Sequence, residues 1–196
     1  MKNSKLLKQI EFIKEIDKIK YIQRRTKLFN SDRNENDAEH SWHLAMMAIV
    51  LSEYSDQEID LLKVIKMVLI HDIVEIDAGD TFLYDQNKSH DNTEEETKCA
   101  ARIFGMLPEE QARDFFDLWV EFEDGTSTEA KFAKSLDNLE PVLQNASNDG
   151  GTWKEYSVKH ATVYDKKKII KDGSTALWDY TKDVLEDSVE KGALEK

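Results

Sequence analysis

Apolar residues recur every three to four positions along most of this chain, which is the period of an α-helix with one buried face. Residues that interrupt helices are scarce, because the sequence contains only 7 glycines and 2 prolines. The pattern therefore predicts an all-α protein. The predicted helices cover about residues 4–22, 37–51, 59–75, 93–104, 108–122, 128–148, 153–168 and 174–191.

Residues with strong preferences for helix ends mark several of these boundaries. Asp37 is the predicted N-cap of the second helix. Ser55 and Glu58 have the spacing of a capping box, which predicts that the third helix starts just after them. Gly105 is expected to end the fourth helix, and Pro108 to lie in the first turn of the fifth.

Two interruptions of the helical pattern lie next to polar residues of chemical interest. Residues 76–92 are rich in Asp, Asn, Ser and Gly and have no sustained period, so they are predicted to form a loop. Pro141 lies inside the sixth predicted helix. Since proline has no N–H for the carbonyl of Asp137, a kink is expected beside that carboxylate.

Length and composition restrict the class of protein. A chain of 196 residues is expected to form a single domain spanning 1–196. Its net charge of −13 argues against binding to polymeric nucleic acid or to an anionic membrane surface. No apolar run is long enough for a membrane span or a signal peptide. Cys99 is the only cysteine, which is typical of a cytoplasmic protein.

The dipeptide His71-Asp72 is the first candidate for chemistry, because it interrupts a run of large aliphatic residues. An unpaired buried carboxylate there would be costly, and a bound metal would offset the cost. His40 and Asp137 are the further candidate ligands. Taken singly, His40 could be a hydrogen-bonded structural histidine, and Asp137 could border a solvated face with Lys134.

Two further features suggest a phosphate substrate. Glu75 lies one helical turn after His71, where a general acid or base could reach the ion, although it could also be a solvated glutamate. Residues 18–33 are strongly basic in an otherwise acidic chain. Such a run is usually a solvated face, but the planar guanidinium of arginine also matches a phosphate group. The combination favours a metal-dependent hydrolase of a phosphate monoester.

Three blocks of sequence carry a specific family resemblance: RRTKLFNSDRNENDAEHSWHLAMMA, LIHDIVEIDAGD and EAKFAKSLDNLEPVLQ. Their pattern of separated histidine, His-Asp pair and aspartate, together with HDxxExxxGD, resembles the HD-domain phosphohydrolases of the 5′-deoxynucleotidase branch. The resemblance covers about residues 5–150 and is loose over 151–196. It implies an HD-type helical bundle.

The resemblance also implies roles for individual residues. It makes Glu75 the catalytic acid or base, Asp80 a further active-site carboxylate and Arg25 the phosphate-binding arginine. Thr26 follows this arginine where the bacterial nucleotidase has tryptophan. The implied metal ligands are His40, His71, Asp72 and Asp137.

The implied reaction converts a (deoxy)nucleoside 5′-monophosphate to a nucleoside and phosphate, and the family suggests a homodimer. Mixed nitrogen and oxygen ligands favour one Mn²⁺, Co²⁺ or Fe²⁺ ion, with Zn²⁺, Ni²⁺ or Mg²⁺ as alternatives. His43 is a weaker candidate ligand because Trp42 and Leu44 suggest that it packs. Two other readings stay open: a catalytically inactive nucleotide sensor and a helical interaction module.

Overall fold

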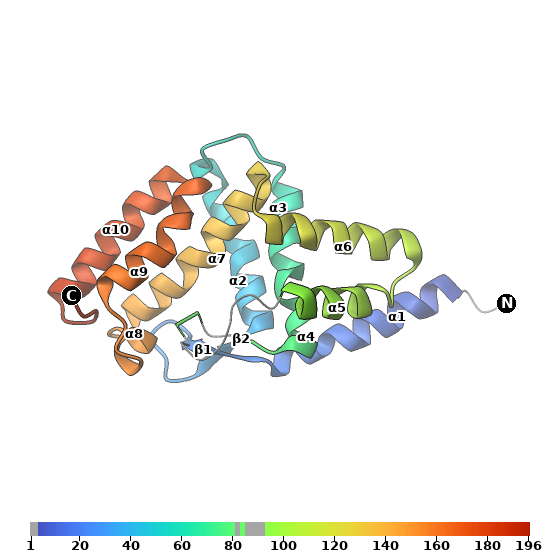
Figure 1. Cartoon of the computed structure of the whole chain (residues 1–196), viewed down its shortest axis with the longest axis horizontal. Coiled ribbons are helices and arrows are strands. Elements are labelled where there is room, and N and C mark those ends of the chain that lie inside the picture. The colour runs from blue at the N-terminus through green and yellow to red at the C-terminus, as the bar shows by residue number, and fades with distance from the viewer. Residues whose placement is uncertain (1–3, 81–82, 85–92) are drawn as a thin grey trace.

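The computed structural model describes residues 4–80, 83–84 and 93–196, and the prediction of an all-α protein is confirmed (Figure 1). Short 3₁₀ segments connect several helices: η1 (Asp17–Tyr21), η2 (Ser52–Tyr54), η3 (His71–Val74) and η4 (Lys168–Asp172). The α-helices are α1 (Ser4–Ile16), α2 (Asp37–Leu51), α3 (Leu61–Ile70), α4 (Glu75–Ala78), α5 (Thr93–Phe104), α6 (Glu109–Asp124), α7 (Thr128–Ser147), α8 (Gly151–Glu155), α9 (His160–Lys167) and α10 (Thr175–Glu190).

Several predicted boundaries differ from the structure. The N-cap of α2 is Asn36, one residue before Asp37, and Asn36 and Glu39 form a reciprocal capping box there. The predicted capping box of the third helix is wrong, because the side chain of Asp60 caps α3 instead. The helix predicted over 153–168 is divided among α8, α9 and the start of η4, whereas the one predicted over 174–191 corresponds to α10. Of the loop predicted over 76–92, the residues 81–82 and 85–92 lie outside the described part.

A small antiparallel sheet, which the sequence pattern did not predict, joins β1 (Gln23–Lys27) to β2 (Asn34–Asn36). Both strands are short and polar, so neither has the apolar alternation by which a half-buried strand is recognised. The sheet lies directly before α2, and its last residue is the N-cap of that helix. It therefore brings the basic segment of the sequence close to the start of α2.

Helix α7 runs through the middle of the molecule, between α9 and α10 on one side and α2 and α3 on the other (Figure 1). Its apolar residues pack with those of α2, α3 and α10 in one buried cluster, which includes Leu44, Met67, Leu136 and Trp178. Pro141 lies within α7, so the Asp137 carbonyl receives no N–H from residue 141. This central position brings α7 against both the N-terminal helices and the C-terminal elements.

Two further buried clusters flank the central one. The first joins α1, α5 and α6 through residues such as Phe12, Phe104 and Trp119, so the aromatic face of α6 is largely core. The second surrounds Trp153 and contains Leu185 from α10. Among the helices that the structure describes, none is sufficiently long and apolar to span a bilayer.

Candidate active site

The structure brings the four predicted metal ligands together from three separate elements. His40 comes from α2, His71 and Asp72 form the start of η3, and Asp137 comes from α7. Asp137 Oδ1 lies 3.1 Å from His40 Nε2 and 3.7 Å from His71 Nε2. Asp72 Oδ1 lies 3.1 Å from His71 Nε2, and Asp72 Oδ2 lies 3.9 Å from His40 Nε2. Side chains from three distant segments thus come together: His40, His71 and Asp72 can place one ligand atom each within 4.8 Å of one another, and Asp137 lies beside both histidines.

Both histidines present Nε2 to this point because Nδ1 of each ring has another partner. Nδ1 of His71 lies 2.9 Å from the carbonyl oxygen of Val68, to which it donates when it carries the proton. Nδ1 of His40 lies 3.3 Å from Glu140 Oε2 and 3.5 Å from Glu35 Oε2. Partners of this kind fix the ring orientation and leave the lone pair of Nε2 free for a metal.

These residues fit a divalent cation. Metal–ligand bonds of about 2.0–2.2 Å place neighbouring donor atoms on one ion roughly 3 Å apart, close to the shortest separations found here. The buried Nε2 of His71 has no hydrogen-bond partner among the described residues. A bound cation would satisfy this nitrogen and would also neutralise the adjacent carboxylates.

Interactions within the cluster shift the pKa values of its members strongly. Burial alone would raise the pKa of Asp137, but the hydrogen bond with His40 and the nearby charge of His71 outweigh it and hold the pKa well below the usual value. Burial alone would likewise lower the pKa of His40, yet hydrogen bonds with surrounding carboxylates, led by Asp137, raise it well above normal. Without a cation, the histidines therefore stabilise the ionised carboxylate, which is the form that binds metal.

A second group of carboxylates lies beside the ligands. Asp37, Glu75 and Asp80 can place one oxygen each within 4.8 Å of one another. Burial, followed by the neighbouring charge of Asp72, raises the pKa of Glu75 well above its usual value. The same two causes raise the pKa of Asp37 to about 7. At least part of this group therefore retains a proton near neutral pH.

The sequence reasoning missed Arg24, which contacts these carboxylates directly. Arg24 Nη1 donates a hydrogen bond to Asp72 Oδ2 at 2.9 Å and lies 3.5 Å from Asp37 Oδ1. Its Nε lies 3.5 Å from Glu35 Oε2. The two adjacent arginines differ in burial, because Arg24 is partly buried against this cluster whereas Arg25 is exposed. The family resemblance selected Arg25 and gave no role to Arg24.

The sequence reasoning also missed the buried polar residues behind His40. Glu35 and Glu140 are at most 1% exposed, and Gln144 Nε2 donates to both of them. Hydrogen bonds from His40 and His43 outweigh the effect of burial and lower the pKa of Glu140 to about 2. The predicted weaker ligand, His43, instead contacts Glu140, with Nδ1 lying 3.3 Å from Glu140 Oε1. The sequence contained one indication of the position of Glu140, because this residue follows Asp137 by about one helical turn.

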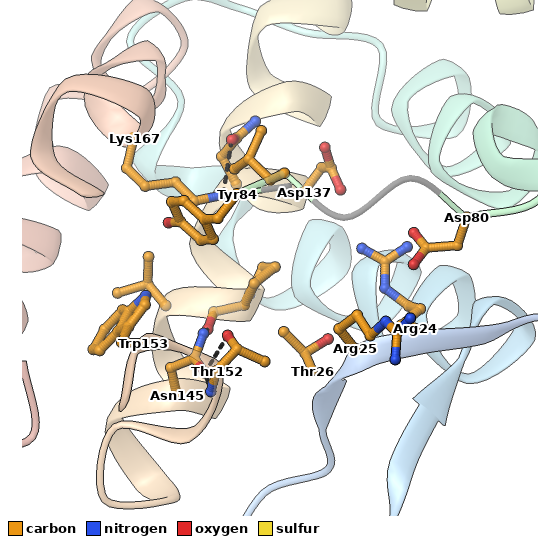
Figure 2. A pocket seen from close by; sticks show the side chains of 14 residues that line it. Arg24, Arg25, Thr26, Asp80, Tyr84, Asp137, Asn145, Thr152, Trp153 and Lys167 are labelled. Atoms are coloured by element: carbon orange, nitrogen blue, oxygen red, sulfur yellow. Dashed lines mark hydrogen bonds between the residues drawn. The ribbon is translucent and has the colours of Figure 1, made fainter. Parts of the chain in front are cut away.

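A cavity of about 150 Å³ opens beside Asp137. Figure 2 shows Arg24, Arg25 and Thr26 on one side of it and Trp153 and Lys167 on the other. Asp80 also lines the cavity, on the side of the arginines. The carboxyl-terminal elements, for which the sequence suggested no role, therefore form one wall. The cavity combines cationic, carboxylate and aromatic groups next to the ligand cluster.

Comparison with known proteins agrees with this geometry. A model of the HD domain matches residues 16–178. The chain belongs to the HD-domain family. The resemblance inferred from the motifs is therefore confirmed at the level of the family.

Individual HD-domain proteins are similar over most of the chain. The human protein 5′-deoxynucleotidase HDDC2 is 29% identical over 136 residues, which cover 69% of this chain and 65% of that protein, slightly less than two thirds. Its relative of the same name from Dictyostelium discoideum is 31% identical over 141 residues and is covered to 74%. A crystal structure named as a predicted metal-dependent phosphohydrolase from Magnetospirillum magnetotacticum MS-1 has a TM-score of 0.93 and 47% identity, with 98% of this chain and 97% of that chain covered.

Proposed function

We propose that this HD-domain protein is a metal-dependent phosphohydrolase that removes the phosphate from deoxynucleoside 5′-monophosphates. The observation that carries the proposal is the convergence of His40, His71, Asp72 and Asp137 beside a cavity that Arg25 lines. The similarity to proteins named 5′-deoxynucleotidase and metal-dependent phosphohydrolase supports this class of reaction.

The four convergent side chains would hold a single divalent cation. When bound, such a cation supplies Lewis acidity towards a phosphate oxygen and towards water. The mixture of imidazole and carboxylate ligands favours Mn²⁺, Co²⁺ or Fe²⁺. Arg24 maintains the orientation of Asp72 through its hydrogen bond, and the carbonyl of Val68 maintains that of His71.

Glu75 and Arg25 act on the substrate in this proposal. Because its pKa is raised, Glu75 holds a proton that it can donate to the departing 5′-oxygen, and it can take up a proton from the attacking water in exchange. Arg25 binds the phosphate oxygens with its guanidinium group. Asp80, which lines the cavity, would accept a hydrogen bond from the sugar.

A phosphate-release assay tests the proposal. Deoxy- and ribonucleoside 5′-monophosphates are each incubated with the protein in the presence of Mn²⁺, Co²⁺, Mg²⁺ or a chelator. We expect release from deoxynucleotides with Mn²⁺ or Co²⁺ and none with the chelator. Measurable nucleotide affinity without phosphate release under any of these conditions would contradict the proposal and would favour the nucleotide sensor.

We also propose that the protein is a cytoplasmic homodimer. Apolar side chains on two described helices are at least 40% exposed: Leu6, Leu7, Ile10 and Ile13 on α1, and Trp42, Met46, Ile49 and Val50 on α2. Exposed apolar surface of this kind is typical of interfaces. Light scattering coupled to size-exclusion chromatography tests the dimer, and a mass of 22.7 kDa at all concentrations would contradict it.

A further inference from the structure

Lys167, the last residue of α9, is a buried cation at the substrate cavity. The residue is 4% exposed, and its Nζ donates a hydrogen bond to Asn138 Oδ1 at 3.1 Å. Within residues 4–80, 83–84 and 93–196, no carboxylate lies within 4.0 Å of Nζ. A buried ammonium group is costly unless an anion and several hydrogen bonds accompany it. A single hydrogen bond to a neutral group therefore does not offset the cost of burying the charge of Lys167.

The surroundings of Lys167 indicate what would complete this site. The side chain lines the same cavity as Arg25 and Asp137, and Figure 2 shows it on the side of the cavity away from Arg24 and Arg25. An ammonium group has three N–H donors, of which Asn138 accepts one. The remaining donors can serve a ligand that enters the cavity.

We propose that Lys167 binds the phosphate group of the substrate from the side of the cavity opposite Arg25. The inference rests on the proposed function, which places a phosphate monoester in this cavity. Of the groups in a nucleotide, the phosphate carries the charge, so it compensates a buried ammonium better than a base carbonyl or a sugar hydroxyl does. Lysine as a compact point charge and arginine as a planar donor would then bind different oxygens of one phosphate.

The competing explanation is that Lys167 only balances the acidic residues around the metal ligands. Burial lowers the pKa of Lys167 to about 8, and the charge of Asp137 offsets part of this effect. If charge balance were its only role, replacing the ammonium would leave the surrounding carboxylates more negative and would change metal affinity, in the direction of tighter binding. If Lys167 binds phosphate, replacement would weaken phosphate binding while metal affinity stays the same.

Titration calorimetry on three Mn²⁺-loaded proteins distinguishes the two explanations: wild type, K167M and K168M. Methionine retains the length of the side chain without its charge. Lys168 is the matched control because its side chain is 63% exposed and pairs with Asp165 at the surface. The probes are inorganic phosphate and thymidine, which carry the phosphate and the nucleoside separately. Binding of Mn²⁺ to each metal-free protein is measured in parallel.

We expect K167M to bind inorganic phosphate about tenfold to a hundredfold more weakly than wild type, the range for a lost hydrogen bond to a charged group. Thymidine affinity, Mn²⁺ affinity and the phosphate affinity of K168M should stay within about twofold of wild type. Removal of a buried charge should leave the thermal midpoint of K167M equal or higher.

Several results would overturn the inference. These are equal phosphate affinity in K167M and wild type, no phosphate binding by wild type, an equal loss of thymidine affinity in K167M, or a change of Mn²⁺ affinity by more than about twofold in either direction. The proposed function fails by a different result, because it requires phosphate release from deoxynucleotides. If phosphate binding depended on Lys167 but no phosphate were released, the inference about Lys167 would stand and the proposed function would fail.

Discussion

At the scale of single residues, neighbouring side chains of the same type have different surroundings. Arg24 is surrounded by Asp72, Asp37 and Glu35, whereas Arg25 is exposed at the cavity. Burial lowers the pKa of Arg24, but the adjacent carboxylates, led by Asp72, outweigh this effect and raise it well above normal. The first arginine therefore compensates the charge of buried carboxylates, and the second is open to the cavity.

Substituting methionine for each arginine separates these roles. We expect Arg24→Met to lower the free energy of unfolding by about 3–5 kcal/mol, because it leaves buried carboxylates without their counter-charge. Arg25→Met should change the free energy of unfolding by less than about 0.5 kcal/mol, as for other exposed positions, while KM for a deoxynucleotide rises. Urea unfolding and steady-state kinetics measure the two effects. Equal destabilisation by both substitutions would contradict the assignment.

Glu75 should control turnover, whereas Asp72 should control metal binding. Glu75→Gln retains the shape of the side chain but cannot exchange a proton, so kcat should fall roughly a hundredfold to ten-thousandfold with Mn²⁺ affinity unchanged. Asp72→Ala removes a ligand and should abolish stoichiometric Mn²⁺ binding. Metal analysis after dialysis and a phosphate-release assay test this pair. Unchanged turnover in Glu75→Gln would remove Glu75 from the mechanism.

At the scale of elements, the start of α3 shows why sequence reasoning misplaces helix ends. Ser55 and Glu58 have the spacing of a capping box, but Ser55 Oγ donates to the carbonyl of Gln57 within a turn. The side chain of Asp60 instead accepts a hydrogen bond from the backbone N–H of Lys63. Glu129 of α7 accepts a hydrogen bond from the backbone N–H of Asp60 and so holds this residue in place. A contact across 69 residues therefore determines where the helix begins.

This assignment makes a prediction for the stability of α3. We expect Asp60→Ala to lower the free energy of unfolding by about 1 kcal/mol through loss of the N-cap. Glu58→Ala is the control, since it removes only the residue that the sequence pattern selected, and it should cost less than about 0.5 kcal/mol. Chemical unfolding monitored by circular dichroism measures both variants. If Glu58→Ala lowered the free energy of unfolding more than Asp60→Ala, Ser55 and Glu58 would be the residues that cap the helix.

At the scale of the whole molecule, the C-terminal elements pack against the same central helix as the N-terminal ones. Ser135 Oγ on α7 donates to the carbonyls of Lys131 and Ile170 and so links α7 to η4. A Cβ atom at Gly173 would lie 2.5 Å from the Lys131 carbonyl oxygen and 2.6 Å from Ser135 Oγ. Backbone from the C-terminal region therefore approaches α7 more closely than any side chain permits.

We expect Gly173→Ala to lower the free energy of unfolding by about 1–3 kcal/mol, because the added methyl group forces the two segments apart. If the chain is one domain, as its length predicts, far-UV circular dichroism and tryptophan fluorescence should shift together in a single transition. Lys171→Ala, at an exposed position of η4, is the control and should change little. An additional early transition in only one of the two signals would indicate a separate C-terminal unit.

The sequence by itself determined most of the helices and selected four residues that the fold brings close together. Helices follow from local periodicity, and the His-Asp pair is recognisable because its two residues are adjacent in an apolar run. The ligands beyond that pair, His40 and Asp137, were selected together with it through the spacing of a known family. These patterns can be recognised in a sequence because each one depends on neighbouring residues or on fixed separations along the chain.

Only the tertiary structure decided which charged residues surround the ligands. The pairing of β1 with β2 directs Arg24 to Asp72, the approach of α7 to α2 buries Glu140 against His40, and α9 brings Lys167 to the cavity. Each contact joins residues that are far apart in the chain. Burial and charge compensation are properties of the folded neighbourhood, so no local pattern distinguishes Arg24 from Arg25 or Lys167 from Lys168.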